Sequence, residues 1–347
     1  MRKYIQHPLA AGILCLLLIV LFHSPRWWLL VHESPGTCEW DRALSYLQQC
    51  EDPFRADVEP AMHWRFVPQV FVWAVGGDRA VGLAVPWLGV VALASFVFYR
   101  LRKHGYDVGT AFGLCTLLLS SAPTLVSLGW LGMNDAWVAL GLAVLAFGER
   151  RLPILLACVL CPLIDERFVF GIPGAVLVRY YPFEGVRWRV ILGCLLGALA
   201  PFLVYRAIGL ALGRGGMSGF LLSSIQSSRA YLWCAPMGLW MAFRFAYVPP
   251  ALRIHREFAQ RRLACIALVS GCAVPTVVGF FLATDTMRTA SILLPLCLWG
   301  VLGSQQVDRT WAYWLAFGNL VVPVAQVTYT KITPVNSILI ELWRILR

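Results

Sequence analysis

The chain has 347 residues, of which 59% are hydrophobic and only 14% are charged, and its mean hydropathy is +0.70. Soluble domains carry about 25% charged residues, so this composition excludes an ordinary water-soluble protein and indicates an integral membrane protein. The net charge of +11 comes without any Cys or His spacing typical of metal fingers, which also excludes a nucleic-acid-binding module.

The first predicted element is an apolar helix over residues 9–21. Arg2 and Lys3 precede it, and His23-Ser24-Pro25-Arg26-Trp27-Trp28 follows it without the small-residue cleavage site of a signal peptide. Paired tryptophans are typical of a membrane–water interface. The pattern therefore predicts a retained signal-anchor helix with its amino end in the cytoplasm.

Ten further apolar segments follow the first one along the chain. They cover residues 81–99, 109–127, 134–148, 152–164, 168–178, 190–211, 231–248, 263–283, 289–303 and 310–326. The sequence thus predicts an all-α polytopic integral membrane protein, a single transmembrane domain over residues 1–347 with about eleven (10–12) transmembrane helices. Several segments are shorter than the roughly 20 residues that cross the hydrocarbon layer, so broken or re-entrant spans are expected among them.

The basic residues agree with this threading of the chain. With the amino end inside, the cytoplasmic segments hold 15 basic and five acidic residues, whereas the external segments hold equal numbers of each sign. Such asymmetry is the positive-inside signal of membrane topology, and it accounts for the net charge without a nucleic-acid partner. It also predicts an external carboxy terminus.

The longest segment between spans is external and covers residues 23–80. It holds eight of the 18 acidic residues, and a loop of this length is expected to contain helices. Composition predicts one helix over residues 41–49 and an apolar, interface-lying or re-entrant helix over residues 64–75. Cys38 and Cys50 also lie in this loop, and two interpretations stay open: a disulfide formed in an oxidising compartment, or two free thiols.

Short external turns bring ionisable residues to the same edge of the membrane. Asp135 follows one apolar segment, and Asp165-Glu166-Arg167 lies between two segments that are short for a full span. Ionisable groups at membrane depth are costly unless they are paired or face a wet cavity, which makes them candidates for a functional site. The alternative is a self-contained ion pair of Asp165 or Glu166 with Arg167 on a tight helical hairpin.

Two more pairs of candidates have similar alternatives. Asp285 and Arg288, spaced i, i+3, are either site residues or a local ion pair at a helix start, with Thr284 or Asp285 as N-cap. His63 and Arg65 precede the predicted interface helix. They either face the same cavity as the other external charges, or Arg65 extends to lipid headgroups.

Common catalytic motifs do not occur in the sequence. A Walker-type GxxxxGK[ST] loop, HExxH, GxSxG and a nucleotide-binding glycine pattern are all missing. An ATP-driven pump, a zinc protease and a serine hydrolase therefore have no sequence support. The energy for any reaction is expected to come from the substrate.

The arrangement resembles the GT-C superfamily of polytopic glycosyltransferases, which combine a retained first helix, a large first external loop and an active site on the outer face. The resemblance covers the layout of most of the chain and four motifs: Glu39-Trp40-Asp41, His63-Trp64-Arg65-Phe66-Val67-Pro68, Asp165-Glu166-Arg167 and Asp285-x-x-Arg288. It implies a bacterial inner (plasma) membrane enzyme of the cell envelope. Such an enzyme transfers a sugar from a polyprenyl-phosphate donor to an external glycan or lipid acceptor.

The resemblance also implies roles for the candidate residues. Asp41 is expected to act as general base on the acceptor hydroxyl. Planar guanidinium groups suit the departing phosphate, and the expected phosphate ligands are Arg65, Arg167 and Arg288. The residues expected to orient sugar hydroxyls or to hold a divalent cation are Asp135, Glu166 and Asp285, with His63 and Asp165 completing the substrate-binding set.

Two other classes of function fit the same residues. The first is a transporter or flippase for a lipid-linked or anionic solute, in which the arginines contact the substrate and no bond is broken. The second is a non-catalytic membrane scaffold or assembly factor. The position of the charges discriminates among them, because transport sites lie near the midplane, whereas a lipid-linked transferase has a site open to the outer face.

Overall fold

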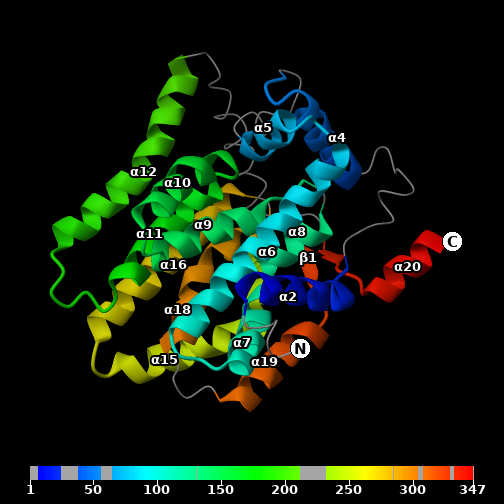
Figure 1. The fold of residues 1–347 in the computed structure, drawn as a ribbon. Coiled ribbons are helices and arrows are strands. Elements are labelled where there is room, and N and C mark those ends of the chain that lie inside the picture. Colours follow the sequence, from blue (N-terminus) through cyan, green and yellow to red (C-terminus); the bar gives the residue numbers. More distant parts are fainter. Residues whose placement is uncertain are drawn as a thin grey trace.

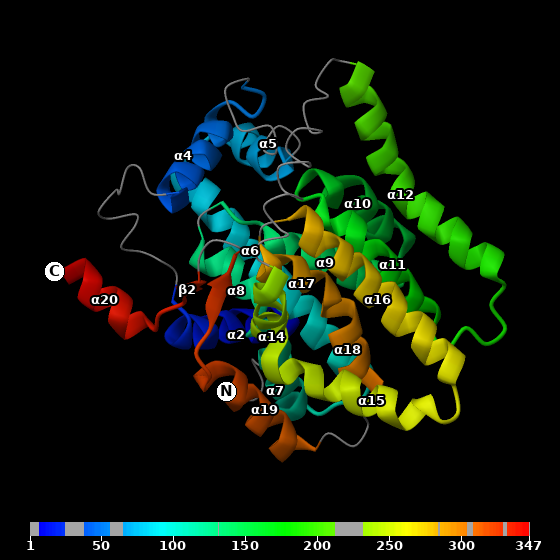
Figure 2. The ribbon, with the colours of Figure 1, turned by 180° about the vertical axis from the view of Figure 1, so that it is seen from behind.

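The computed structural model of the chain describes residues 7–24, 38–55, 65–130, 132–211, 232–283, 285–303, 308–328 and 332–346. These residues form an α-helical bundle with one small antiparallel sheet of two strands (Figures 1 and 2). The α-helices of the first half are α2 (Pro8–Phe22), α4 (Cys38–Glu51), α5 (Val67–Ala74), α6 (Arg79–Lys103), α7 (Val108–Leu119), α8 (Ala122–Gly129), α9 (Asp135–Phe147), α10 (Arg151–Leu160) and α11 (Arg167–Tyr180).

The second half continues the bundle and adds the strands. Its α-helices are α12 (Trp188–Ala211), α14 (Ala235–Phe243), α15 (Val248–Phe258), α16 (Arg262–Leu282), α17 (Thr286–Ala290), α18 (Leu294–Gly303), α19 (Arg309–Val321) and α20 (Ile338–Leu346). Short 3-10 turns are η1 (Cys161–Leu163), η2 (Leu232–Cys234), η3 (Arg244–Tyr247) and η4 (Ser291–Leu293). The strands are β1 (Ala325–Val327) and β2 (Ile332–Pro334).

Four helices in the described part of the chain are long and apolar enough to cross a membrane. They are α6, α12, α16 and the continuous stretch Thr286–Gly303, and α7 with α8 makes a fifth if that pair, bent by 64°, is one span. The expected eleven spans are therefore not confirmed, although each expected apolar segment contains helix. The physical reason is length: α2 has 15 residues and rises only about 22 Å, less than the roughly 30 Å of hydrocarbon.

The expected last span, residues 310–326, is helical only as far as Val321. Pro323 follows, and proline disfavours helical backbone at the residue before it. The chain then forms β1, whose residues are all buried and pair with β2 in the register Ala325 with Pro334. The apolar composition of this segment thus belongs partly to a buried strand.

The interior of the bundle lies around α6, α7, α9, α11 and α18. Helix α2 packs along α6 near the front in Figure 1, and α16 packs against α11. In the stretch Thr286–Gly303, 89% of the apolar span is buried inside the protein, whereas in α12 only 11% of the apolar span is buried. Helix α12 therefore presents most of its apolar surface outward, whereas the helix that carries Arg288 is central.

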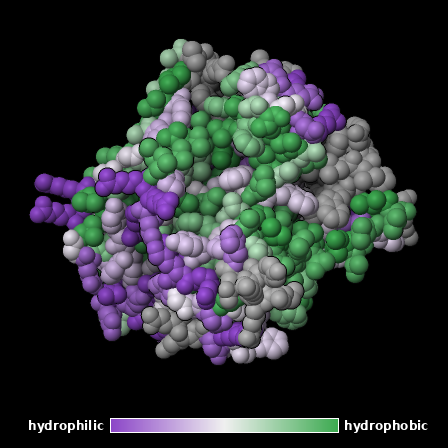
Figure 3. Space-filling model, in the orientation of Figure 1, coloured by the Kyte–Doolittle hydropathy of each residue, from purple (hydrophilic) through white to green (hydrophobic). Residues whose placement is uncertain are grey.

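Charged residues gather at one end of the bundle. At the carboxy end of α6, Arg100 pairs with Glu149 at 2.5 Å, and Lys103 pairs with the same carboxylate. At the start of α16, Arg261 pairs with Glu184 at 3.0 Å. Figure 3 shows apolar residues across the middle of one face, with hydrophilic residues at the lower left and over α4 at the upper right. This pattern is typical of a surface that crosses an apolar layer.

The segment predicted as the large external loop contains the two predicted helices, α4 and α5. Helix α4 packs on α5 and on the start of α6, where the Tyr46 hydroxyl donates to the Gly82 carbonyl at 3.0 Å. The disulfide candidate is wrong: Cys50 is a free, buried thiol, and Cys38 begins the same continuous helix. Twelve residues of helix separate their backbones by about 18 Å, far beyond disulfide reach.

Candidate functional site

Three helix starts meet at one place and bring ionisable residues together. Asp135 is the first residue of α9, Arg167 is the first of α11, and Asp285 caps α17 by accepting from the backbone N–H of Arg288 at 3.1 Å. Asp165 likewise accepts from the backbone N–H of Arg167 at 3.0 Å. Carboxylates are stabilised at helix amino termini by the unpaired N–H groups and the helix dipole. Interactions at the starts of the helices therefore position each carboxylate.

Asp135 is the partner of Arg288 across 153 residues of sequence. The Arg288 Nε donates to Oδ1 at 3.0 Å and its Nη2 donates to Oδ2 at 2.8 Å, which is a two-pronged guanidinium–carboxylate pair. Arg167 Nη1 lies 3.4 Å from the same carboxylate. Asp135 and Arg288 are each only 4% exposed. The pair is thus sealed inside the protein.

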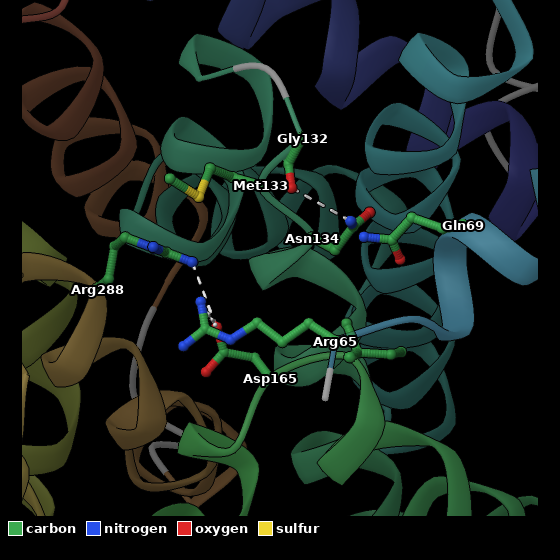
Figure 4. A pocket seen from close by; sticks show the side chains of 8 residues that line it. Arg65, Gln69, Gly132, Met133, Asn134, Asp165 and Arg288 are labelled. Carbon is green, nitrogen blue, oxygen red and sulfur yellow. Dashed lines mark hydrogen bonds and ion pairs between the residues drawn. The ribbon is translucent and has the colours of Figure 1, made fainter. Parts of the chain in front are cut away.

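Asp165 lies among all three arginines of the site. Arg167 donates to it from Nε at 2.8 Å and from Nη2, Arg288 Nη2 lies at 3.4 Å, and Arg65 Nη1 lies at 3.5 Å. Figure 4 shows Arg65 and Arg288 reaching Asp165 from opposite sides. Burial raises the pKa of Asp165, but the charges of Arg167 and Arg65 more than offset burial and hold that pKa well below its usual range. Asp165 is therefore ionised.

Arg65 joins the predicted loop to the start of α11. Its Nε and Nη2 donate to the two oxygens of Glu166 at 3.0 and 2.7 Å. The Glu166 side chain is 25% exposed, which makes it the most exposed carboxylate among Asp135, Asp165 and Glu166. Burial raises the pKa of Glu166, but the charge of Arg65 and the hydrogen bonds to the carboxylate together more than offset burial, so the pKa is below its ordinary value. The Arg65–Glu166 ion pair therefore forms the most exposed edge of the site.

Asp285 differs from the other carboxylates. It accepts from Gln326 Nε2 at 2.5 Å, and its closest guanidinium atom, Arg288 Nε, is 3.9 Å away. Burial raises the pKa of Asp285 above its ordinary value, and the charges of Arg288 and Arg167 only partly oppose this effect. The described residues of the site therefore include three arginines and four carboxylates, and the charge of Asp285 is the least compensated of the four.

A small cavity adjoins the ion pairs (Figure 4). Its volume is about 20 Å³, which is room for about one water molecule. Asn134 Oδ1 and Gln69 Oε1 are buried there and find no hydrogen-bond partner within the described ranges. Gly132 shapes the wall: its φ is +75°, and a side chain there would meet the Tyr46 ring at 2.7 Å. The cavity lining consists of Arg65, Gln69, Gly132, Met133, Asn134, Ile164, Asp165 and Arg288.

Most of the predicted site residues lie together in this cluster. They come from four segments and are Arg65, Asp135, Asp165, Glu166, Arg167, Asp285 and Arg288. The local alternatives also hold, because Asp165 pairs with Arg167 and Asp285 is the N-cap of α17. Long-range pairs join these local ones. The three arginines are consequently engaged with carboxylates and do not form an open anion clamp.

Two predicted residues fall outside the side chains that the structure describes. Asp41 lies in the first turn of α4, and its side chain is outside the described set. His63 lies outside the described residues altogether. The assignment of Asp41 as general base and of His63 as a substrate ligand stays a prediction.

Sequence reasoning missed several polar residues of the cluster. Gln69 and Gln326 are single amides in apolar segments, and Asn134 directly precedes Asp135. Arg206 on α12 lies near enough to Glu166 to interact with its charge. A lone amide in an apolar run was the available signal, because a buried amide needs a partner or a cavity.

No group of three or more His, Cys, Asp or Glu side chains suited to a metal ion occurs in the described ranges. The carboxylates of the cluster take arginines as partners instead. Comparisons of the chain with protein-family models, with curated proteins and with solved structures found no match. The chemistry of the site itself has to carry any functional assignment.

Proposed function

We propose that this chain is a polytopic inner-membrane glycosyltransferase of GT-C type, which transfers a sugar from a polyprenyl-phosphate donor to an external glycan or lipid acceptor. In this proposal the amino end is cytoplasmic. The shorter apolar helices supply the remaining passages through the membrane, which makes eleven in all. The charged cluster at the starts of α9, α11 and α17 is the polar part of the substrate site. The opposite, basic end of the bundle faces the cytoplasm.

One observation carries the proposal: seven ionisable side chains from four segments converge inside a bundle of apolar helices. Removing charges from water costs several kcal/mol per ion, and apolar packing of the same helices would avoid this cost. Buried ionisable residues of membrane proteins therefore mark functional sites by default. Stability alone gives no reason for so many charges in one place.

The residue types suit transfer from a phosphate. The acceptor oxygen forms the new bond to the sugar carbon, the bond from that carbon to the phosphate oxygen breaks, and the phosphate leaves with the electron pair. A carboxylate takes the acceptor proton, and Asp41 is the proposed base. Arg65 is the outermost arginine, and it binds the phosphate by exchanging its Glu166 partner for phosphate oxygens.

The experiment measures sugar transfer in membrane vesicles that contain the protein. Undecaprenyl-phosphate glucose and undecaprenyl-phosphate mannose, each radiolabelled in the sugar, serve as probes. Arg65→Gln is expected to lower transfer by about 100-fold, as when one donor to a developing anion is lost. Asp41→Asn is expected to abolish transfer and to leave donor binding intact, since it removes a base without changing shape.

The matched control is Arg100→Gln, which removes an arginine from a carboxylate pair at the other end of the bundle. It is expected to transfer sugar like the unaltered protein. Thermal unfolding in detergent shows that each variant is folded. Equal transfer by Arg65→Gln, Asp41→Asn and Arg100→Gln would contradict the proposed site.

A transporter or flippase is the second candidate, and one observation favours it. Helices α7 and α8 bend by 64° at Ser120–Ser121 inside the bundle, and broken helices line the binding sites of many transporters. Flux of the same labelled donors across vesicles, with the sugar–phosphate bond intact, would favour this class. Transfer of the label to an acceptor would favour the enzyme.

A further inference from the structure

A second buried cation lies apart from the cluster, at the turn between α14 and α15. Arg244 begins η3 and is fully buried, with 0% of its surface exposed. Its backbone has φ +46° and ψ −115°, a conformation that side-chain-bearing residues rarely adopt. Strained backbone persists only where the surroundings hold it, and it concentrates at binding and active sites.

Neutral oxygens surround the Arg244 guanidinium. Its Nε donates to Asn319 Oδ1 at 3.4 Å, and its Nη2 donates to the carbonyls of Asn319, at 2.8 Å, and Ser120. Asn319 Nδ2 in turn donates to the Leu117 carbonyl at 3.0 Å. Leu117 and Ser120 lie at the carboxy end of α7, where carbonyls lack helical partners. Arg244 therefore sits at the break between α7 and α8.

The positive charge of Arg244 has no carboxylate partner among the described residues. Its third nitrogen, Nη1, is buried and makes no hydrogen bond to the part of the chain that the structure describes. A guanidinium stays protonated in proteins, so the group is a buried cation with an unused donor. Such a group is costly in an apolar interior unless a counter-charge joins it.

His23 provides an independent observation at the same place. It ends α2 and is only 3% exposed, and neither ring nitrogen makes a hydrogen bond of normal geometry to a described residue. Helix α2 contacts α7 and α19, and α7 contacts η3, so the end of α2 lies in the same part of the bundle as Arg244. The ring is close enough to Arg244 to interact with its charge. Buried polar groups in folded proteins are nearly always hydrogen-bonded, so the His23 ring and the single Arg244 atom Nη1, both without a partner among the described residues, indicate a missing ligand. Helix α8 begins beside them and adds the positive end of its dipole.

We propose that Arg244 and His23 form an internal oxyanion-binding site at the α7–α8 break, which takes a phosphate group. Arg244 supplies the charge and the free Nη1 donor, and His23 supplies a ring N–H. The phosphate belongs either to a free inorganic ion or to an anionic lipid headgroup. The site is separate from the Asp135–Arg288 cluster, whose arginines already have carboxylate partners.

The test measures thermal unfolding of the full chain after purification and removal of lipid in detergent. Inorganic phosphate is titrated against sodium chloride at equal ionic strength. In a second arm, phosphatidylglycerol replaces phosphatidylcholine in mixed micelles. A ligand at about 100 times its Kd is expected to raise Tm by roughly 5 °C in a saturable way. A rise in the first arm assigns a free ion, and a rise in the second arm alone assigns a lipid.

The variants decide where the ligand binds. Arg244→Gln is expected to remove the rise in Tm that the ligand causes. His23→Gln, which keeps a polar side chain of similar size, is expected to reduce that rise. Arg288→Gln alters the other cluster and is expected to retain it. His23→Gln keeps the test valid even where Arg244→Gln fails to fold.

Two results would overturn the proposal. The first is no saturable rise in either arm, which would leave Arg244 only as a cap on the helix break. The second is a rise that Arg288→Gln removes and His23→Gln leaves unchanged, which would place the anion in the cluster. That second result would support the proposed phosphate site of the transferase, so the two proposals fail separately.

Discussion

The two buried charged regions of this protein handle their charge in opposite ways. In the cluster at α9, α11 and α17, every arginine lies within 3.5 Å of a carboxylate oxygen. At the α7–α8 break, the partners of Arg244 among the described residues are all neutral oxygens. Removing one member of a paired set leaves a buried charge behind, whereas removing an unpaired cation leaves only unsatisfied carbonyls. The two regions should therefore respond differently to mutation.

The largest expected effect is that of Asp135→Leu. This change leaves the guanidinium of Arg288 without its two-pronged partner in a site that is 4% exposed. Breaking a buried pair from one side costs about 3–5 kcal/mol. We expect a loss of this size in the free energy of unfolding, measured by denaturant titration in detergent.

The double variant Asp135→Leu with Arg288→Met sharpens this prediction. It removes both charges and fills the space with apolar groups, so most of the lost stability is expected to return. A double variant that is less stable than Asp135→Leu would show that the pair is not the source of the effect.

Arg244→Met should have a smaller effect, of about 1–3 kcal/mol. It leaves the carbonyl of Asn319 without its donor, and the carbonyl of Ser120 keeps a weaker donor in Asn319 Nδ2, 3.4 Å away. The same denaturant titration measures it. An Arg244→Met loss larger than that of Asp135→Leu would reverse the comparison and point to a hidden carboxylate partner.

The pH dependence distinguishes two carboxylates within the cluster. Burial raises the pKa of Asp285 above 3.8, so its contribution to stability is complete below pH 3.8 and is lost as the pH rises through its folded pKa. Asp285→Asn mimics the protonated form and is expected to be more stable than the unaltered protein at neutral pH, with the difference vanishing in acid. A difference that grows in acid would show that the pKa of Asp285 is lowered instead.

The pH dependence of stability expected from Asp165 is opposite to that expected from Asp285. Burial raises the pKa of Asp165, but Arg167 and Arg65 lower it further, to well below 3.8. Its contribution is therefore present above pH 3.8 and is lost as the pH falls through the folded pKa. Unfolding followed from pH 7 to below pH 3 is expected to show stability falling once the pH drops below 3.8 in the unaltered protein, and a smaller fall in Asp165→Asn.

The smallest effect is expected from Glu149→Gln at the basic end. Its partners Arg100 and Lys103 reach water, and its own side chain is 51% exposed. Exposed ion pairs contribute little because water and salt screen them. An unfolding free energy within error of the unaltered protein is expected, and a loss comparable to that of Asp135→Leu would contradict the contrast between buried and exposed pairs.

Local features of the fold were predictable from the sequence. The expected helices over residues 41–49 and 64–75 are α4 and α5, and Asp285 was correctly predicted as an N-cap candidate. These features depend on apolar composition and on residues within one turn of helix, which the sequence states directly. Of the two interpretations left open for Cys38 and Cys50, the disulfide is excluded, because the predicted helix extends over both residues and holds their backbones too far apart.

The sequence by itself determined that the chain is apolar and helical, and that its basic residues are concentrated in alternate segments between the apolar ones. It also placed four ionisable residues at the ends of apolar segments, namely Asp165, Arg167, Asp285 and Arg288. Tertiary structure alone decided which charges meet: Arg288 takes Asp135 across 153 residues, and Arg244 takes Asn319 across 75. The number of long helices and the bend between α7 and α8 were decided there too. The physical reason is that caps and apolar periodicity act within a few residues, whereas the partner of a buried charge depends on how the helices pack.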